Sequence, residues 1–260
     1  VESVKEMEDQ LKQTFHLKEV FVSPNLVDDE EINLRDTCRA LAGNLDKYII
    51  DNTVVAVSWG NTLNCLAGQI QPLKAKDIKV VQLNGGVAKS ASSTGASQIV
   101  DALTMAGHGI GYMFPVPAIV DSKHTSEILQ EETQVKNVLR LAKEAEVSIF
   151  SIGALSKDSI LYEVEYLKDE DFQALEKNKA VGDIASRYFD INGNIALKEL
   201  DDRVVGFGLE ELREKEWTIA IAVGVNKVDA IIGALRAGFM NVLYTDEKTA
   251  REILNRNLLG

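Results

Sequence analysis

The segment Val54-Val55-Ala56-Val57-Ser58-Trp59-Gly60-Asn61-Thr62 joins a short apolar run to the start of a helical pattern. The apolar residues predict a buried strand, and the pattern over residues 61–70 predicts a helix. A small-residue turn between a strand and a helix leaves backbone N–H groups free at the positive end of the helix dipole, where phosphates and carboxylates bind. Gly60, Asn61 and Thr62 are therefore candidate phosphate ligands. The alternative is an ordinary Asn or Thr helix cap that contacts only water.

Length and composition indicate a globular α/β protein. The chain has 260 residues, 45% of them hydrophobic, which suits one large domain or two small ones. Its apolar runs are far shorter than the roughly 20 residues that a membrane span needs. The first residues are acidic and lack the basic flank and apolar centre of a signal peptide, so we expect a cytoplasmic protein. The two cysteines, Cys38 and Cys65, are expected to be core thiols.

The charge of the chain argues against direct binding of nucleic acid. The formal net charge is −12, and 28 basic residues are scattered among 40 acidic ones. Nucleic-acid binding depends on neutralising many phosphates with Lys and Arg, and no basic cluster provides this. The three histidines, His16, His108 and His124, have neither catalytic nor metal-ligand spacing. We therefore expect no metal and no cofactor.

Strand-like and helix-like segments alternate along the chain. Strands are predicted at residues 18–22, 53–57, 78–83, 110–114, 147–152, 218–223 and 241–244, and helices at 30–50, 61–70, 97–106, 133–144, 227–237 and 247–255. Repeated strand–helix–strand units with short apolar strands predict a doubly wound parallel sheet with helices on both faces. Such a sheet binds ligands at the carboxyl ends of its strands, near a switch in strand order.

Four of the turns that follow these strands are rich in small or polar residues, at 60–62, 84–86, 153–156 and 224–227. In the second, the paired glycines after Asn84 permit close approach of the backbone to a ligand, and a tight turn is the alternative. The fourth places Lys227 beside the start of a helix, where it can supply a point charge to a phosphate. The alternative for Lys227 is an ordinary surface lysine.

The alternation breaks between residues of about 155 and 205, which predicts a small excursion from the sheet. Asn192-Gly193 signals a tight turn within it, of the kind found in hairpins. Asp183 is a candidate acceptor for sugar hydroxyls. It alternatively caps the segment that begins at Ile184, or pairs with Arg187.

Six segments spread over nearly the whole chain carry a further signal. They are Val57-Ser58-Trp59-Gly60-Asn61-Thr62, Leu83-Asn84-Gly85-Gly86, residues 180–190 from Ala180-Val181-Gly182-Asp183 to Phe189-Asp190, Asp202-Arg203-Val204-Val205-Gly206, residues 223–231 with Asn226-Lys227, and Thr245-Asp246-Glu247-Lys248-Thr249-Ala250. In this order they resemble the sugar-binding domain of the SorC-type bacterial transcriptional regulators, which include the deoxyribonucleoside and central glycolytic gene regulators. The resemblance implies a fold similar to glucosamine-6-phosphate deaminase and ribose-5-phosphate isomerase, used to sense a phosphorylated sugar.

The resemblance also implies roles for individual residues. It places the phosphate at Gly60, Asn61 and Thr62 with help from Lys227, and the sugar hydroxyls near Asn84, Gly85, Gly86, Thr94 and Asp183. Some relatives carry a basic residue where this chain has Asn84, which leaves the identity of the sugar open. Asparagine neither forms a Schiff base nor grips a second phosphate, so we expect a singly phosphorylated sugar.

The family resemblance further implies a division of the chain and an assembly. Residues 1–15, with Val4, Met7, Leu11 and Phe15 at helical spacing, are expected to connect to an N-terminal helix-turn-helix module absent from this chain. The alternative is a helix docked on the domain. Residues 16–260 then form the effector-binding domain, a dimer or tetramer that reaches DNA only through that module and contacts no membrane.

The rival interpretation is an enzyme on the same fold, either a sugar-phosphate isomerase or an amino-sugar-phosphate deaminase. Such chemistry needs a carboxylate base over the first carbons of the sugar and a partner that stabilises the enediolate. The acidic Asp-Gly-Ala-Asp-Glu run of the isomerases is missing, and Asp183 is the one carboxylate in a suggestive motif. The sequence therefore favours a sensor over an enzyme. A purely structural oligomerisation module would not need polar turns at its strand ends.

Overall fold

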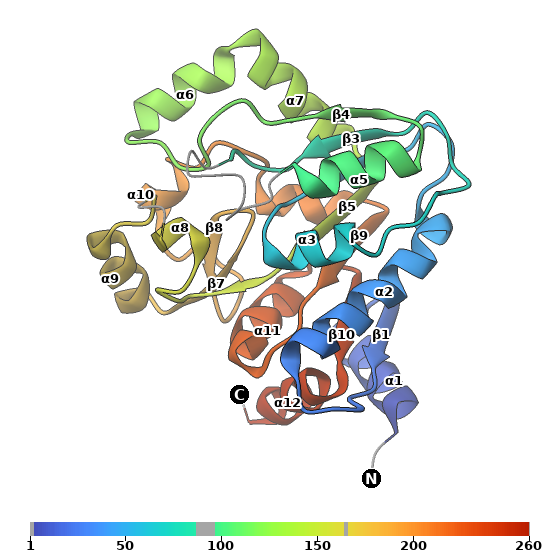
Figure 1. The fold of residues 1–260 in the computed structure, drawn as a ribbon. Coiled ribbons are helices and arrows are strands. Elements are labelled where there is room, and N and C mark those ends of the chain that lie inside the picture. The colour runs from blue at the N-terminus through green and yellow to red at the C-terminus, as the bar shows by residue number, and fades with distance from the viewer. Residues whose placement is uncertain (1–2, 87–96, 164–165, 260) are drawn as a thin grey trace.

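A computed structural model gives the fold, and it describes residues 3–86, 97–163 and 166–259. Seven parallel strands form the main sheet in the order β1-β10-β9-β5-β2-β3-β4 (Figure 1). Their bounds are β1 Glu19–Ser23, β2 Val54–Val57, β3 Lys79–Gln82, β4 Ile110–Tyr112, β5 Val147–Ser151, β9 Trp217–Ile221 and β10 Val242–Asp246. The prediction of a parallel sheet is confirmed. Its strand order changes direction between β2 and β5.

Both faces of this sheet are covered by helices, which explains why its strands are almost continuously apolar. Side chains alternate between the faces along each strand, so that Val55 and Val57 join one core while Ala56 joins the other. The helices that contribute to these cores are α1 Val4–Phe15, α2 Glu30–Tyr48, α3 Asn61–Ala67, α5 Gln98–Ala106, α7 Thr133–Glu144, α11 Val228–Ala237 and α12 Glu247–Leu258. Figure 1 shows α3 and α5 in front of the sheet. No helix in the described residues is long and apolar enough to cross a bilayer.

A second, smaller sheet lies beside the carboxyl ends of the main strands, on the left in Figure 1. It is antiparallel, in the order β6-β7-β8, with bounds β6 Gly153–Ala154, β7 Ala180–Ile184 and β8 Arg187–Asp190. Helices α8 Ile160–Glu163, α9 Asp169–Lys177 and α10 Lys198–Asp201 flank it, and it has an apolar cluster of its own. This is the predicted excursion. Residues 192–193 form the expected tight turn, since the Gly193 N–H donates to the Asp190 carbonyl over 2.9 Å.

Helix α1 docks on the domain. Met7 and Leu11 are buried in the core, and the helix contacts β1 and α12. The Glu8 carboxylate accepts the Val22 N–H over 3.2 Å, so it satisfies a backbone donor of the edge strand β1. Within the described residues, α1 thus packs as the docking alternative expects, and the connecting role of residues 1–15 stays a prediction.

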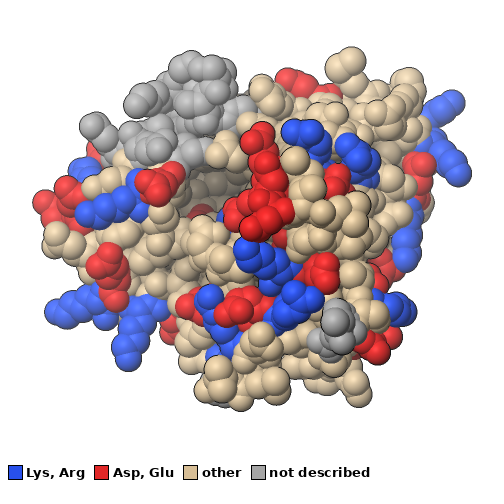
Figure 2. Space-filling view, turned by 60° about the horizontal axis from the view of Figure 1, so that its bottom comes forward, with Lys and Arg blue, Asp and Glu red and all other residues tan. Residues whose placement is uncertain are grey.

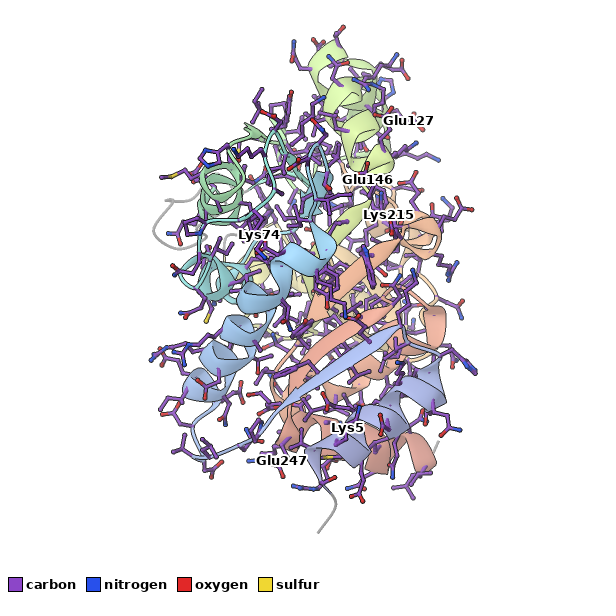
Figure 3. The ribbon with its side chains drawn as sticks, turned by 90° about the vertical axis from the view of Figure 1, so that its right-hand side faces the viewer. Lys5, Lys74, Glu127, Glu146, Lys215 and Glu247 are labelled. Carbon is purple, nitrogen blue, oxygen red and sulfur yellow. The ribbon has the colours of Figure 1, made fainter. Side chains whose placement is uncertain are left out.

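The opposite end of the sheet, where the strands begin, is fastened by charged side chains that cap backbone groups. The Lys215 Nζ donates to the carbonyl oxygens of Ala142, Lys143 and Ala145 at the end of α7, over 2.8, 3.0 and 2.8 Å. The Glu146 carboxylate accepts the N–H of Val54, the first residue of β2, over 2.8 Å. Figure 3 shows Lys215 and Glu146 near each other, far from Glu247 and Lys5. These hydrogen bonds stabilise the end of the main sheet where its strands begin. The carboxyl ends of the strands, at the opposite edge, are therefore the place to look for a binding site.

Some element boundaries differ from the prediction, and each difference has a local reason. The helix expected over 227–237 begins with a 3-10 turn, η2 (Val225–Lys227), before α11. The strand expected over 110–114 ends at Tyr112, ahead of the proline-rich turn. Helix α6 (Lys123–Glu131) was not predicted, because Ser126 is its one buried residue and its sequence lacks apolar periodicity. A short 3-10 helix, η1 (Leu209–Glu214), was also missed.

Candidate functional site

A cavity of about 390 Å³ opens where the carboxyl ends of the main strands meet the small sheet. Residues 58–62 after β2 and residues 226–227 after β9 line it from the main sheet, together with the end of β5. The turn between β7 and β8 closes it from the other side. It therefore occupies the edge beside the switch in strand order, where open parallel sheets bind their ligands.

The turn after β2 presents an uncapped helix start to this cavity. Gly60 precedes α3 with a φ of 133°, a conformation that L side chains rarely adopt, and no side chain caps the helix there. Asn61 and Thr62 form the first turn of α3, and both line the cavity. The three predicted phosphate ligands thus lie together. The alternative of an Asn or Thr side-chain cap does not describe this turn.

The fourth predicted phosphate ligand, Lys227, faces the same cavity from η2. Its side chain is half-buried, and it makes no hydrogen bond or ion pair with the described residues. Burial lowers the pKa of Lys227 from its ordinary value, while Glu30 and Asp183 act in the opposite direction. A cation held in a cavity without a fixed partner differs from an ordinary surface lysine. It is suited to neutralise an anion that enters from solvent.

Asp183 lies on β7 and lines the wall opposite the phosphate turn. Its Oδ2 accepts the Ser186 N–H over 3.1 Å, and its Oδ1 lies over Gly153, where a Cβ would come within 2.5 Å. Asp183 does not pair with Arg187, whose partner is Asp201. Burial raises the pKa of the Asp183 carboxyl to about 6, although the Ser186 hydrogen bond and Lys227 oppose this shift. The cavity thus holds a carboxylate that is costly to ionise.

Replacing Asp183 by Asn should stabilise the unliganded fold near neutral pH. The ordinary pKa of Asp is 3.8, and the folded-state value is about 6. Near pH 3 the carboxyl is largely protonated in both states. Between about pH 4 and pH 6 it ionises in the unfolded state but not in the folded state, so stability falls, and above pH 6 the full cost of the poorly solvated charge is present. At roughly 1.4 kcal/mol per pKa unit, Asp183→Asn should add about 3 kcal/mol at pH 8 and almost nothing near pH 3. Urea unfolding at both pH values measures this difference, and an Asn variant less stable than wild type at pH 8 contradicts it.

The other predicted sugar ligands fall in different places. Asn84 lines the cavity and is 3% exposed. Gly85 and Gly86 are not among the lining residues: a Cβ on Gly85 would lie 2.5 Å from the carbonyl oxygens of the 116–117 turn, and Gly86 bridges to Pro117. Gly85 and Gly86 therefore adjoin residues 116–117, and their assignment to the sugar stays a prediction. Thr94 lies outside the described residues.

Two hydrogen bonds join the turn after β2 to the turn after β3 and to the end of β5, and these three segments form the floor of the cavity. The Trp59 indole Nε1 donates to the Gly85 carbonyl over 2.8 Å, which ties the turn after β2 to the turn after β3. The Ser58 Oγ accepts the Ser151 N–H over 3.4 Å, which ties it to the end of β5. Gly85 therefore contributes through its backbone and its packing.

The two cysteines lie on α2 and α3, close to the turn after β2. Cys38 is buried on α2, as predicted, and its Sγ contacts the Thr62 carbonyl at 3.8 Å. Cys65 is half-buried on α3, so the prediction of a core thiol is only partly right. A hydrogen bond from Cys38 lowers the pKa of the Cys65 thiol to about 7.

Sequence reasoning missed the contribution of the β7–β8 turn to this site. Ser186 and Tyr188 both line the cavity and are 3% and 4% exposed. Burial and the nearby Asp183 raise the pKa of Tyr188 well above its usual range. The turn contains neither Gly nor Asn, so nothing in its composition signalled a hairpin. Asn226, Ser156 and Ser159 also line the cavity, and the first two belong to polar turns noted in the sequence.

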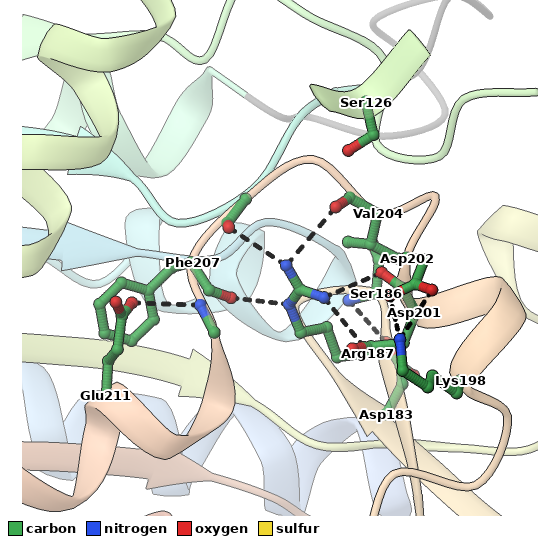
Figure 4. A network of polar contacts seen from close by, with 12 residues as sticks. Ser126, Asp183, Ser186, Arg187, Lys198, Asp201, Asp202, Val204, Phe207 and Glu211 are labelled. Atoms are coloured by element: carbon green, nitrogen blue, oxygen red, sulfur yellow. Dashed lines mark hydrogen bonds and ion pairs between the residues drawn. The ribbon is translucent and has the colours of Figure 1, made fainter. Parts of the chain in front are cut away.

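Arg187 fastens this turn to the segment that follows α10 (Figure 4). Its Nε donates to the Phe207 carbonyl over 2.9 Å, and its Nη1 donates to the Asp201 carboxylate over 2.9 Å. Its Nη2 reaches the carbonyl oxygens of Gly206 and Val204 over 3.2 and 3.5 Å. Because residue 206 also bridges to Asn84, Arg187 links the turn to the floor of the cavity.

No group of three or more His, Cys, Asp or Glu side chains in the described residues is placed to hold a metal ion. His16 and His108 occupy left-handed turns, with φ of 55° and 46°, and His124 is exposed on α6. None of them lines the cavity. On the face shown in Figure 2, Lys and Arg side chains are interspersed with Asp and Glu, without a continuous basic surface.

Comparisons with known proteins agree with this geometry. Residues 1–255 match the family described as "Putative sugar-binding domain". The deoxyribonucleoside regulator of Bacillus subtilis is 33% identical over 220 residues, which cover 85% of this chain and 70% of that protein. A DeoR family transcriptional regulator from Listeria monocytogenes has a TM-score of 0.88 at 27% identity, covering 97% of this chain and 100% of the other.

The full-length sorbitol operon regulator SorC from Klebsiella pneumoniae shares the fold, with a TM-score of 0.88 at 23% identity over 96% of this chain and 81% of that one. The resemblance drawn from the six sequence segments is thereby confirmed. The chain belongs to the sugar-binding domain family of the DeoR- and SorC-type transcriptional regulators.

Proposed function

We propose that this domain senses a phosphorylated sugar in the described cavity and does not turn it over. The observation that carries the proposal is the pairing of Lys227, a half-buried cation without a fixed partner, with the uncapped start of α3 in one cavity. A phosphate group would take hydrogen bonds from the backbone N–H groups at Asn61 and Thr62 and from the Thr62 hydroxyl, while Lys227 neutralises its charge. The sugar would then extend toward Asp183 and Asn84.

Several features support a sensor rather than an enzyme. Isomerisation or deamination needs a base and a second group that moves or stabilises charge at the neighbouring carbon. Asp183 and Asp158 are the carboxylates in the described lining, no histidine joins them, and Asp158 is exposed. The relative from B. subtilis is named as a regulator.

The alternative is a sugar-phosphate isomerase or deaminase, and one observation favours it. A carboxyl with a pKa of about 6 suits a general base near neutral pH. Incubating purified protein with ribose 5-phosphate and glucosamine 6-phosphate, followed by chromatography of the sugars, separates the two functions. Turnover that disappears in Asp183→Asn would establish the enzyme.

Binding itself is best tested by thermal shift against a panel of sugar phosphates. A ligand at a hundred times its Kd should stabilise the fold by about 2.7 kcal/mol, which is readily detected. Inorganic phosphate and the unphosphorylated sugars serve as controls for each half of the ligand. Equal shifts with a sugar and with its phosphate would contradict the phosphate site.

The cavity should prefer a monophosphate to a bisphosphate and bind it noncovalently. Lys227 is the one cation in the described lining, and Asn84 offers neither an amine nor a guanidinium for a second phosphate. Calorimetry with fructose 6-phosphate and fructose 1,6-bisphosphate should therefore show tighter binding of the former. Borohydride treatment followed by mass spectrometry should show no sugar adduct. A trapped adduct or tighter bisphosphate binding would overturn this prediction.

The remaining parts of the proposal concern the regulator as a whole. We expect the domain to form a homodimer or homotetramer in the cytoplasm, and to act on DNA through a helix-turn-helix module joined near α1. The mixed charges in Figure 2 and the net charge of −12 are consistent with a domain that leaves DNA contacts to another module.

A further inference from the structure

The turn between β7 and β8 is built from residues that two-residue turns of this kind seldom use. Ala185 and Ser186 have φ values of 50° and 70°, both in the left-handed region. Hairpin turns with positive φ at both central positions strongly prefer Asn and Gly, because a Cβ in the left-handed region comes too close to the following carbonyl oxygen. The surrounding structure must therefore hold this turn in place.

Contacts on both sides of Ser186 hold the β7–β8 turn in this conformation. Its N–H donates to the Asp183 carboxylate over 3.1 Å, and the following residue, Arg187, is anchored to the segment after α10. The Ser186 Oγ accepts the Asn84 Nδ2 over 3.0 Å. Ser186 and Asn84 are each 3% exposed, and both line the cavity. Figure 4 shows Ser186 close to Arg187 and its network.

This arrangement leaves hydrogen-bonding groups unused at the cavity wall. The Asn84 Oδ1 is buried and has no hydrogen-bond partner among the described residues. Turning the amide over would only move the unmet group to Nδ2, because the Ser186 hydroxyl bonds one amide atom in either orientation. Asp183 Oδ1 accepts no hydrogen bond from the described residues. A buried polar atom without a partner is unfavourable, so an incoming group that completes these bonds gains affinity.

We infer that Ser186 is a positioning residue for the sugar specificity of this cavity, because its hydroxyl bonds one atom of the Asn84 amide and leaves the other amide atom to bond a hydroxyl group of the ligand, which can donate to Oδ1 or accept from Nδ2. The inference rests on the proposed binding of a sugar phosphate with its phosphate near Lys227. Asp183 Oδ1 and Asn84 Oδ1 are both acceptors, which suits sugar hydroxyls and disfavours a second anion. Ser186 acts through Asn84 and keeps its own O–H for the ligand.

The test compares Ser186→Ala and Ser186→Gly with wild type. Both variants remove the hydroxyl, but only glycine also relieves the strained φ. Calorimetry gives the Kd of ribose 5-phosphate, glucose 6-phosphate and inorganic phosphate for each protein. The affinity of the better sugar phosphate relative to inorganic phosphate should fall about tenfold in both variants, as expected for loss of a hydrogen bond. The Kd of inorganic phosphate should stay within about twofold, since the phosphate turn is untouched.

Lys179→Gly is the matched control, because Lys179 also has a left-handed φ, 59°, but is exposed and lies outside the cavity lining, so this variant relieves strain and keeps the Ser186 hydroxyl. It should preserve the relative affinity and raise the melting temperature. If wild type binds neither sugar phosphate more tightly than inorganic phosphate, the proposed function fails. If wild type does so, and both folded Ser186 variants keep that preference, the role of Ser186 is refuted and the proposed function stands.

Discussion

Lys227→Met should weaken the binding of a sugar phosphate by roughly ten- to a hundredfold. Losing a hydrogen bond to a charged group costs about 1.5–3 kcal/mol, and the variant also removes the one cation in the described lining. Without Lys227, the charge of Asp183 would face the ligand unbalanced, which adds repulsion. Calorimetry at two salt concentrations measures the effect. Thr62→Ala should weaken binding within the same range.

Stability measurements distinguish a binding role of Lys227 from a structural one. Burial lowers the pKa of Lys227, which means that its charge is held at a cost in the unliganded fold. The Met variant should therefore be at least as stable as wild type without ligand. Lys248→Met is the matched control, since Lys248 also lies at a helix start but is 61% exposed and pairs with Asp28. Weaker binding in the control, or a destabilised Lys227 variant, would assign the effect to the fold.

Arg187→Met should lower the free energy of unfolding by about 3–5 kcal/mol, the range expected when one partner of a buried ion pair is removed. The Arg187 side chain is 12% exposed and that of Asp201 is 23% exposed. The variant would leave the Asp201 carboxylate unpaired and several carbonyl oxygens between residues 201 and 207 without donors. For a chain of this size, the melting temperature should fall by roughly 10 °C.

Two further variants sharpen this experiment. Arg187→Lys keeps the charge but lacks the forked donor geometry, so it should recover little of the loss. Arg140→Met removes an exposed pair with Glu144, whose partners are 60% and 55% exposed, and should change stability by less than about 1 kcal/mol. Equal stability of Arg187→Met and Arg140→Met would show that the network in Figure 4 does not hold the turn.

The parallel sheet was predictable because its signal is local. Val54 to Val57 and the other strands are short apolar runs, and a sheet covered on both faces needs nothing else. The side of the cavity where we propose the phosphate was predictable for a related reason. Gly60 and Lys227 each follow such a strand, and parallel strands bring their carboxyl ends to one edge.

The sugar side was harder to predict, because it depends on contacts between residues distant in sequence. Ser186 meets Asn84 across 102 positions, and its turn is held by an arginine network rather than by turn-forming residues. Gly85 was assigned to the sugar because paired glycines are compatible with both ligand approach and tight packing. In the structure, Gly85 packs closely against the carbonyl oxygens of residues 116–117. No sequence pattern indicates that these residues lie near Gly85.

The small sheet has a consequence for how new specificities arise in such domains. All of β6, β7 and β8 comes from one continuous stretch of chain between β5 and β9, whereas the residues proposed to hold the phosphate come from outside it. One exchange of gene sequence covering residues 153–208 would therefore replace most of the surface proposed to face the sugar and leave the proposed anion site and the parallel sheet intact. On the proposed placement of the ligand, such an exchange would change which metabolite the domain recognises without rebuilding the sheet.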